Sequence, residues 1–211
     1  MKERVLIRTL ILFLVWGFLI SPATQANPKD KDRWNKKYDS ESYLFGKHPI
    51  KFLYDHTHLL PKGRVLDIAM GEGRNGVYLA AQGFDVIGLD ISEEGLKKAE
   101  HLARENNVTI ETRVVDLETV QLKKSAFDVI ICSYYMQRDL FSQMKAALKS
   151  GGMVLVETYN IDYLKYNAHF KTEWALNENE LLNSFQDFKI LRYQSVDDGK
   201  LAYSSILAQK P

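Results

Sequence analysis

The amino-acid sequence predicts an α/β fold with a doubly wound, mostly parallel sheet that ends in an antiparallel hairpin. Short apolar runs alternate with helical patterns over most of the 211 residues, which is typical of strand–helix–strand units. The last two apolar runs, 188–196 and 201–208, are separated only by Asp-Asp-Gly-Lys. Because aspartate followed by glycine favours a tight turn, these two strands should pair in antiparallel fashion. The chain length suits one domain.

The predicted strands and helices alternate along the chain from residue 64. The strands cover 64–69, 84–89, 108–115, 127–132 and 153–158, and the helices cover about 75–82, 93–106, 137–149 and 178–185. Gly83 is expected to end the first helix, as glycine often does. Ser92 is expected to cap the second helix, because its hydroxyl can accept a hydrogen bond from the first turn. Glu93 and Glu94 would then lie at the positive end of the helix dipole.

Composition limits the classes of function. The net charge is +1, which provides no general attraction for nucleic acid, so no nucleic-acid partner is expected. Cys132 is the only cysteine, which excludes an intrachain disulfide. Three histidines lie close together in sequence, at positions 48, 56 and 58. They have neither the spacing nor a fourth ligand for a zinc site, so no metal is expected.

A glycine-rich turn follows the first predicted strand. It reads Asp67-Ile-Ala-Met-Gly71-Glu-Gly73-Arg-Asn-Gly76. Glycines between a strand and a helix let the backbone approach a ligand closely and present N–H groups at the start of the helix. Taken alone, the spacing also fits the dinucleotide-binding fingerprint, and a tight turn without any ligand is a further alternative.

Acidic residues at the ends of successive strands favour an adenosyl ligand with an amino-acid end over a dinucleotide. Asp67 would oppose a pyrophosphate, but it can bind an ammonium group or an ordered water. Asp90 ends the second strand, where a carboxylate can accept hydrogen bonds from both hydroxyls of a ribose. Asp116 ends the third strand and can accept an adenine amino group, with Leu117 against the ring. We also expect no second catalytic domain of the kind that a dehydrogenase needs.

The order of four motifs resembles that of class I S-adenosylmethionine (SAM)-dependent methyltransferases. The motifs cover 65–80, 86–92, 127–133 and 148–156. The upstream aromatic residues Trp34, Tyr38 and Tyr43, together with the run from Tyr134 to Arg138, are similar to the tellurite-resistance-type branch. The resemblance implies a Rossmann-like fold, SAM as cofactor and transfer of its methyl group to a small-molecule acceptor. One departure is Ala69, which stands where the family has its first motif glycine.

The resemblance also implies roles for individual residues. The expected SAM-binding residues are Asp67, Ala69, Gly71, Gly73, Asp90, Ile91, Asp116, Leu117 and Ser133. The expected acceptor-facing, catalytic residues are Tyr43, Tyr134, Tyr135 and Arg138. The alternatives are that Tyr135 packs in the core and that Arg138 pairs with acidic side chains. The segment containing Tyr43 either folds over the cofactor as a lid or packs against the edge of the sheet.

The N-terminus has the order of a secretory signal peptide. Three basic residues lie within positions 1–8, an apolar run covers 9–20, and small residues lead to Ala26. The run is shorter than the roughly 20 residues that span a bilayer comfortably. We therefore expect residues 1–26 to be a signal peptide or membrane anchor, and residues 27–211 to form the methyltransferase domain, starting with a polar linker at 27–33.

This N-terminus predicts an exported, periplasmic or membrane-anchored protein, with possible membrane association through the N-terminus. A cytoplasmic location is the alternative, because SAM is made and kept in the cytosol. Two other functions are left open by the sequence. One is a SAM-binding module without catalytic activity, and the other is an NAD-dependent oxidoreductase, which uses the same strand–turn–helix arrangement.

Overall fold

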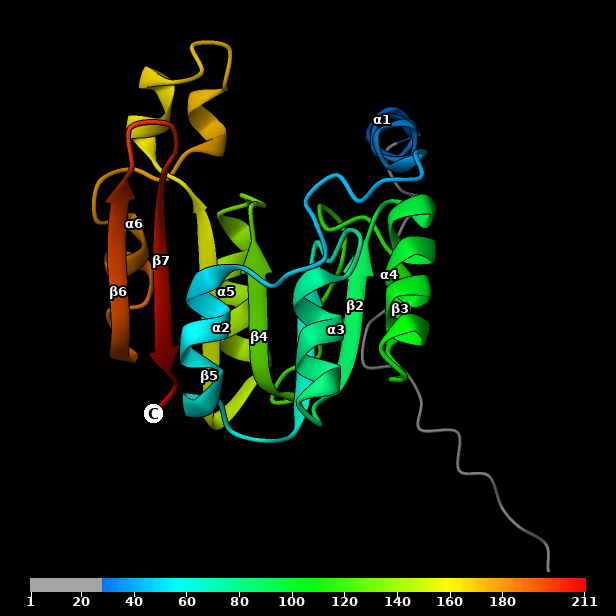
Figure 1. Cartoon of the computed structure of the whole chain (residues 1–211). Helices are drawn as coiled ribbons and strands as arrows, with labels where there is room; N and C mark the ends of the chain where they lie inside the picture. The colour runs from blue at the N-terminus through cyan, green and yellow to red at the C-terminus, as the bar shows by residue number, and fades with distance from the viewer. Residues whose placement is uncertain (1–27) are drawn as a thin grey trace, which may run out of the picture.

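A seven-stranded sheet runs through the centre of the molecule (Figure 1). The computed structural model describes residues 28–211. The strand order is β3-β2-β1-β4-β5-β7-β6. The strands are β1 (Arg64–Ile68), β2 (Asp85–Asp90), β3 (Glu111–Val114), β4 (Phe127–Ser133), β5 (Leu148–Tyr159), β6 (Lys189–Asp197) and β7 (Ala202–Gln209). The predicted fold class is confirmed, since β3, β2, β1, β4 and β5 pair in parallel and β5, β7 and β6 pair in antiparallel fashion.

Helices cover both faces of the sheet. They are α1 (Pro28–Tyr38), α2 (Lys51–His56), α3 (Arg74–Ala81), α4 (Glu93–Glu105), α5 (Asp139–Ala147) and α6 (Glu180–Ser184). Along β4, Val129 and Ile131 pack on the side of α2, α3 and α4, while Ile130 and Cys132 pack on the side of α5 and α6. Because side chains alternate across a strand, an apolar run of this kind is buried on both faces.

Two predicted caps are confirmed. The Ser92 hydroxyl accepts a hydrogen bond from the backbone N–H of Gly95 at 3.1 Å. Gly83 follows α3 with a φ of 83°, the left-handed conformation that favours glycine after a helix. Strand β5 begins earlier than expected, at Leu148, because Leu148 pairs with Phe127 before a register shift in the ladder between β4 and β5.

The prediction of a polar linker at 27–33 is wrong, because α1 begins at Pro28. The segment is too polar to show an apolar stripe, so the helix was not visible in the sequence pattern. The helix is held by contacts with α4 and by aromatic stacking within its last turns. Lys31 forms an ion pair with Glu93 of α4, and the rings of Trp34 and Tyr38 stack at 5.5 Å.

The predicted signal peptide or anchor at 1–26 lies outside the described residues. Among residues 28–211, no helix has both the length and the apolar character needed to cross a membrane.

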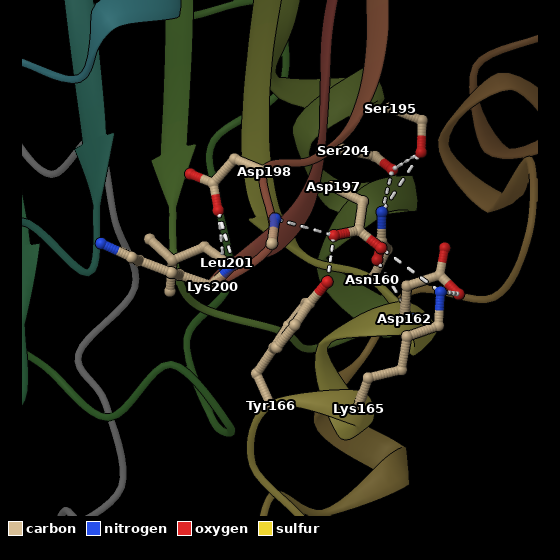
Figure 2. Close-up of polar contacts among 11 residues, drawn as sticks. Asn160, Asp162, Lys165, Tyr166, Ser195, Asp197, Asp198, Lys200, Leu201 and Ser204 are labelled. Atoms are coloured by element: carbon tan, nitrogen blue, oxygen red, sulfur yellow. Dashed lines mark hydrogen bonds and ion pairs between the residues drawn. The ribbon is translucent and has the colours of Figure 1, made fainter.

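A segment between β5 and α6 lies above the carboxyl edge of the sheet (Figure 1). It contains two short 3-10 helices, Ile161–Lys165 and Thr172–Trp174. We call residues 160–177 the cap segment. Figure 2 shows how the β6–β7 hairpin holds it. The buried Asn160 amide donates to the hydroxyls of Ser195 and Ser204, both at 3.2 Å. Tyr166 donates a hydrogen bond to Asp197 at the turn of the hairpin.

Removal of the Asn160 amide should loosen the cap segment. Asn160→Ala removes the donor to the buried Ser204 hydroxyl and one of the two donors to Ser195. A buried polar group that loses its partner costs about 1–3 kcal/mol. We expect this loss in the free energy of urea-induced unfolding, together with faster proteolysis within the cap segment. Asn183→Ala, at an exposed position in α6, is the control and should change stability by about 0.5 kcal/mol or less. Equal stability of the two variants would contradict the anchoring role.

Candidate active site

The glycine-rich turn forms a tight bend between β1 and α3. Ala69, Gly71 and Gly73 have φ values of 55°, 56° and 86°, so every second residue is in the left-handed region. Gly73 is the N-cap of α3. The bend therefore points backbone groups toward the carboxyl edge of the sheet, where ligands bind in open α/β sheets. Ala69 adopts this conformation with a side chain, at a steric cost that glycine avoids.

Asp90 connects the bend to the next helix. Its Oδ2 accepts a hydrogen bond from the Gly71 N–H at 2.7 Å, and its Oδ1 accepts one from the Ser92 N–H at 2.8 Å. Burial raises the pKa of Asp90 above its usual range, and these backbone hydrogen bonds partly offset the effect. A carboxylate oxygen has two lone pairs, so each still has one with which to accept a ligand hydroxyl.

Asp67 carries a buried oxygen that lacks a partner. The side chain is 1% exposed, and within residues 28–211 its Oδ2 has no hydrogen-bond partner. Burial raises the pKa of Asp67 to about 8, and a backbone hydrogen bond from Gly76 opposes this rise. Buried polar atoms are nearly always hydrogen-bonded. An acceptor of this kind therefore fits an ammonium group or a water held between protein and ligand.

The other predicted SAM-binding residues lie along the same edge. Asp116 follows β3 and accepts a hydrogen bond from the Glu118 N–H at 2.9 Å, while Leu117 is buried in the core. Ile91 follows Asp90 directly, between β2 and α4. Ser133 ends β4 and accepts a hydrogen bond from the Asn75 amide at 2.8 Å. The carboxylates of Asp67, Asp90 and Asp116 thus stand at the ends of the adjacent strands β1, β2 and β3.

The four predicted acceptor-facing residues do not converge. Tyr134 has a φ of 54°, and its ring lies 5.0 Å from that of Tyr159 on β5. Tyr135 packs against the core on the α5 side. Its hydroxyl hydrogen bonds to Gln137. Tyr43, which follows α1, instead packs against α4, where its hydroxyl donates to the Lys98 carbonyl at 3.0 Å.

Arg138 holds the cap segment. Its guanidinium donates two hydrogen bonds to the Glu180 carboxylate, at 2.6 and 2.9 Å. It also donates to the backbone carbonyls of Glu173 and Ala175. A bidentate pair of this type fixes geometry well. These contacts match the structural alternative that the sequence left open for Arg138 and leave little of its donor capacity for a substrate.

Sequence reasoning missed several polar residues that organise the site. Asn75 donates to Ser133 and accepts a hydrogen bond from the Ile50 N–H at 3.0 Å. Glu72 is buried and forms an ion pair with Lys98 at 2.8 Å. Both belong to the glycine-rich turn, and their partners Ile50, Ser133 and Lys98 are too distant in sequence to give a local signal. Glu157 is a third case, and its signal was an acidic residue within the apolar run that forms β5.

The end of α1 lies against the bend, and Figure 1 shows α1 above the upper ends of β2 and α4. Tyr38 is 6% exposed, and a methyl group on Gly71 would come within 2.7 Å of its hydroxyl. Asn35 accepts a hydrogen bond from the Ser92 hydroxyl at 2.7 Å. Gly71 therefore allows Tyr38 to lie directly on the turn. The role of this segment as a lid stays a prediction.

The conformation of Ala69 predicts a stabilising substitution. Ala69→Gly removes the steric cost of a left-handed alanine, although it adds entropy to the unfolded chain, so we expect a gain of about 1 kcal/mol or less in the free energy of unfolding. Ala146→Gly, inside the helix α5, should lower it by about 1 kcal/mol. Urea titration of both variants checks that the two changes in the free energy of unfolding have opposite signs. A destabilised Ala69→Gly protein would contradict the backbone strain assigned to Ala69.

The buried Asp67 predicts a specific dependence of stability on pH. In the unfolded chain an aspartate ionises near pH 4, whereas folded Asp67 retains its proton up to a pKa of about 8. The folded state binds more protons between these values, so this contribution to stability is lost as the pH rises toward 8. Asp67→Asn should unfold with less pH dependence than the wild type between about pH 5 and 8. If the free energy of unfolding of the two proteins depended on pH in the same way, the raised pKa of Asp67 would be contradicted.

Comparison with known proteins identifies the domain. Residues 65–152 match a protein-family model described as a methyltransferase domain. The chain is 24% identical to the probable SAM-dependent methyltransferase TehB of Haemophilus influenzae, over 86% of this chain and 67% of that protein. It is 32% identical to the ubiquinone biosynthesis O-methyltransferase of Paraburkholderia phymatum, over 56% of this chain and 53% of that protein. The chain thus spans about half the length of this second relative.

Solved structures share the fold. The crystal structure of Haemophilus influenzae TehB superimposes with a TM-score of 0.64, covering 86% of this chain and 67% of that one at 21% identity. The geranyl diphosphate C-methyltransferase of Streptomyces coelicolor, solved with S-adenosyl-L-homocysteine, superimposes with a TM-score of 0.66 over 90% of this chain and the whole of that one at 17% identity. The chain therefore contains a methyltransferase domain over residues 65–152, and it has the fold of SAM-dependent methyltransferases such as TehB, to which it is similar in sequence.

Proposed function

We propose that the chain transfers the methyl group of SAM to a small-molecule acceptor at the carboxyl edge of its sheet. The observation that carries this proposal is the row of carboxylates, Asp67, Asp90 and Asp116, at the ends of three adjacent strands beside a glycine bend. Such a row matches the chemistry of SAM, which carries an ammonium group, a ribose diol and an adenine amino group.

The residues along this edge would divide the cofactor between them. Asp67 would accept from the ammonium group directly or through a water, which accounts for its unpartnered oxygen. The positive charge of the ammonium would favour release of the proton that buried Asp67 holds in the free chain at neutral pH. Asp90 would accept from the ribose hydroxyls while keeping its two backbone hydrogen bonds. Asp116 would accept from the adenine amino group. The remaining predicted residues would form the walls, through backbone and small side chains at Ala69, Gly71, Gly73 and Ser133 and through apolar side chains at Ile91 and Leu117.

Methyl transfer requires mainly that the methyl donor and the acceptor be aligned. When bound, SAM supplies a methyl group on a sulfonium that is already activated as a leaving group. The chain then needs to align an acceptor with that group and exclude water. Tyr134 is the predicted acceptor-facing residue whose geometry suits this role, because it lies at the end of β4 against Tyr159. Tyr43, Tyr135 and Arg138 would act by fixing the surrounding segments.

A small acceptor is supported by the names of similar proteins. One relative is named as a ubiquinone biosynthesis O-methyltransferase and one structural neighbour as a geranyl diphosphate C-methyltransferase. For the whole chain we further propose that residues 1–26 are a targeting segment and that 27–211 form the catalytic domain. Fractionation of cells that express the full chain would locate the protein, and its N-terminal sequence would show whether the segment is removed.

The main rival is a module that binds SAM without transferring its methyl group. Release of S-adenosylhomocysteine with any acceptor separates an enzyme from such a module. Side-by-side titration with SAM and NADH separates both from an oxidoreductase.

Loss of Asp90 should weaken SAM binding strongly. Asp90→Ala removes a charged acceptor for two ribose hydroxyls, and hydrogen bonds to charged groups contribute about 1.5–3 kcal/mol each. We expect SAM affinity to fall by about 10²-fold or more in calorimetry. Asp85→Asn lies at the opposite end of the same strand and should bind SAM as the wild type does. An Asp90→Ala protein that folds and retains full SAM affinity would contradict the ribose assignment.

A further inference from the structure

Glu157 is a buried carboxylate that has no part in the methyl transfer proposed above. It lies near the carboxyl end of β5 and is 3% exposed. Its register partners are Ser133 on β4 and Ser205 on β7. Glu157 thus lies on the sheet between the SAM-binding edge and the C-terminal hairpin. A buried carboxylate in such a place needs a physical reason, because burial of a charge is costly.

Two hydroxyl groups lie near the Glu157 side chain. Ser205 donates a hydrogen bond to Oε2 at 2.7 Å, and the nearby hydroxyl of Tyr134 lowers the pKa of the same carboxylate. The Tyr134 N–H also donates to the Glu157 carbonyl at 2.7 Å. The backbone hydrogen bond therefore holds Tyr134 directly beside Glu157, with the phenol close enough to affect its carboxylate.

Within the described part of the chain, the surroundings of Glu157 raise the pKa of its carboxylate and provide no basic partner. Among residues 28–211, no basic side chain lies within ion-pair distance of it. Burial raises the pKa of Glu157, and the hydroxyl groups of Ser205 and Tyr134 and the charge of Arg74 on α3 partly offset this rise. Tyr203 on β7 also faces it, and the charge of Glu157 contributes to the raised pKa of that tyrosine.

Tyr134 connects this carboxylate to the predicted acceptor side. The Arg74 guanidinium lies 5.6 Å from the centre of the Tyr134 ring, and Tyr159 packs beside that ring. Tyr159 in turn stacks on Tyr163 of the cap segment at 4.1 Å. Burial raises the pKa of Tyr134, so its phenol keeps its proton at neutral pH. A neutral phenol can pass a proton onward only if it receives another in exchange.

We propose that Glu157 is the final proton acceptor in methyl transfer, with Tyr134 as the relay, and that the acceptor is a hydroxyl compound that enters the reaction with its proton. The inference rests on the proposed function. In the balanced step, the acceptor oxygen bonds to the methyl carbon while the bond from carbon to sulfur breaks and its electron pair stays on sulfur. The acceptor proton moves to the Tyr134 oxygen as the Tyr134 proton moves to the Glu157 carboxylate. Glu157 then returns the proton to solvent through Tyr134.

This role distinguishes two types of nucleophile. An acceptor that is already an anion has no proton to lose and gains nothing from Glu157. Catechol and thiophenol provide a matched pair of aromatic probes, because the catechol oxygen keeps its proton at neutral pH while thiophenol is largely ionised. Glu157 should therefore matter for catechol and not for thiophenol.

The test compares Glu157→Gln with the wild-type full chain on both probes. We expect kcat for catechol to fall by about 10²–10⁴-fold, the usual contribution of proton transfer by a positioned group, with SAM affinity and the rate with thiophenol changed less than about twofold. Wild-type kcat with catechol should rise with pH through the pKa of Glu157 and level off, and the variant should lose this rise. Tyr134→Phe should slow the catechol reaction similarly. Glu178→Gln, an exposed position, is the control for the chemical change itself.

Several results would overturn the inference. Equal losses with catechol and thiophenol would show that Glu157 only maintains the structure of the carboxyl edge. An unchanged pH profile in Glu157→Gln would exclude it as proton acceptor. Wild-type protein that binds SAM but does not methylate catechol would refute the hydroxyl acceptor class while leaving methyl transfer intact, whereas wild-type protein that does not bind SAM would refute the proposed function first.

Discussion

The carboxylate of Asp90 holds together the part of the molecule on which the rest of the site depends. It receives one N–H from the glycine bend after β1 and another from the start of α4. A parallel sheet brings these two loops to the same edge, and the shared acceptor joins them directly. Because the bend is fixed in this way, Asp67 is buried with a free oxygen and Tyr38 can lie on Gly71.

The two halves of the carboxyl edge differ in chemistry. The half made by β1, β2 and β3 presents acidic groups and close backbone, which suits a cationic, polar cofactor. The half made by β4, β5 and the hairpin presents aromatic rings, a buried glutamate and the cap segment, which suits a small acceptor that is shielded from water. The antiparallel hairpin is therefore more than an extension of the sheet, since it supplies Ser205 beneath Glu157 and holds Asn160 of the cap segment.

The sequence predicted the order of strands and helices well, because apolar runs buried on both faces and glycine or serine at helix ends are local signals. It also predicted that Asp67, Asp90 and Asp116 would share an edge, since this follows from a parallel sheet. It failed where the determinants are long-range. The helix α1 is too polar to show a core-facing stripe and depends on contacts with α4. Arg138 and Tyr43 have the right chemistry for substrate contact, but their partners lie 42 and 55 residues away in the chain.

The central claim is that three carboxylates at successive strand ends, beside a glycine bend, hold SAM. A crystal structure of the chain with S-adenosylhomocysteine tests it most directly. We expect the amino end of the ligand near Asp67, the ribose on Asp90 and the adenine between Asp116 and Leu117, with the sulfur directed toward Tyr134. A ligand bound elsewhere, or an edge that stays filled by Tyr38 and its neighbours at saturating ligand, would contradict the claim.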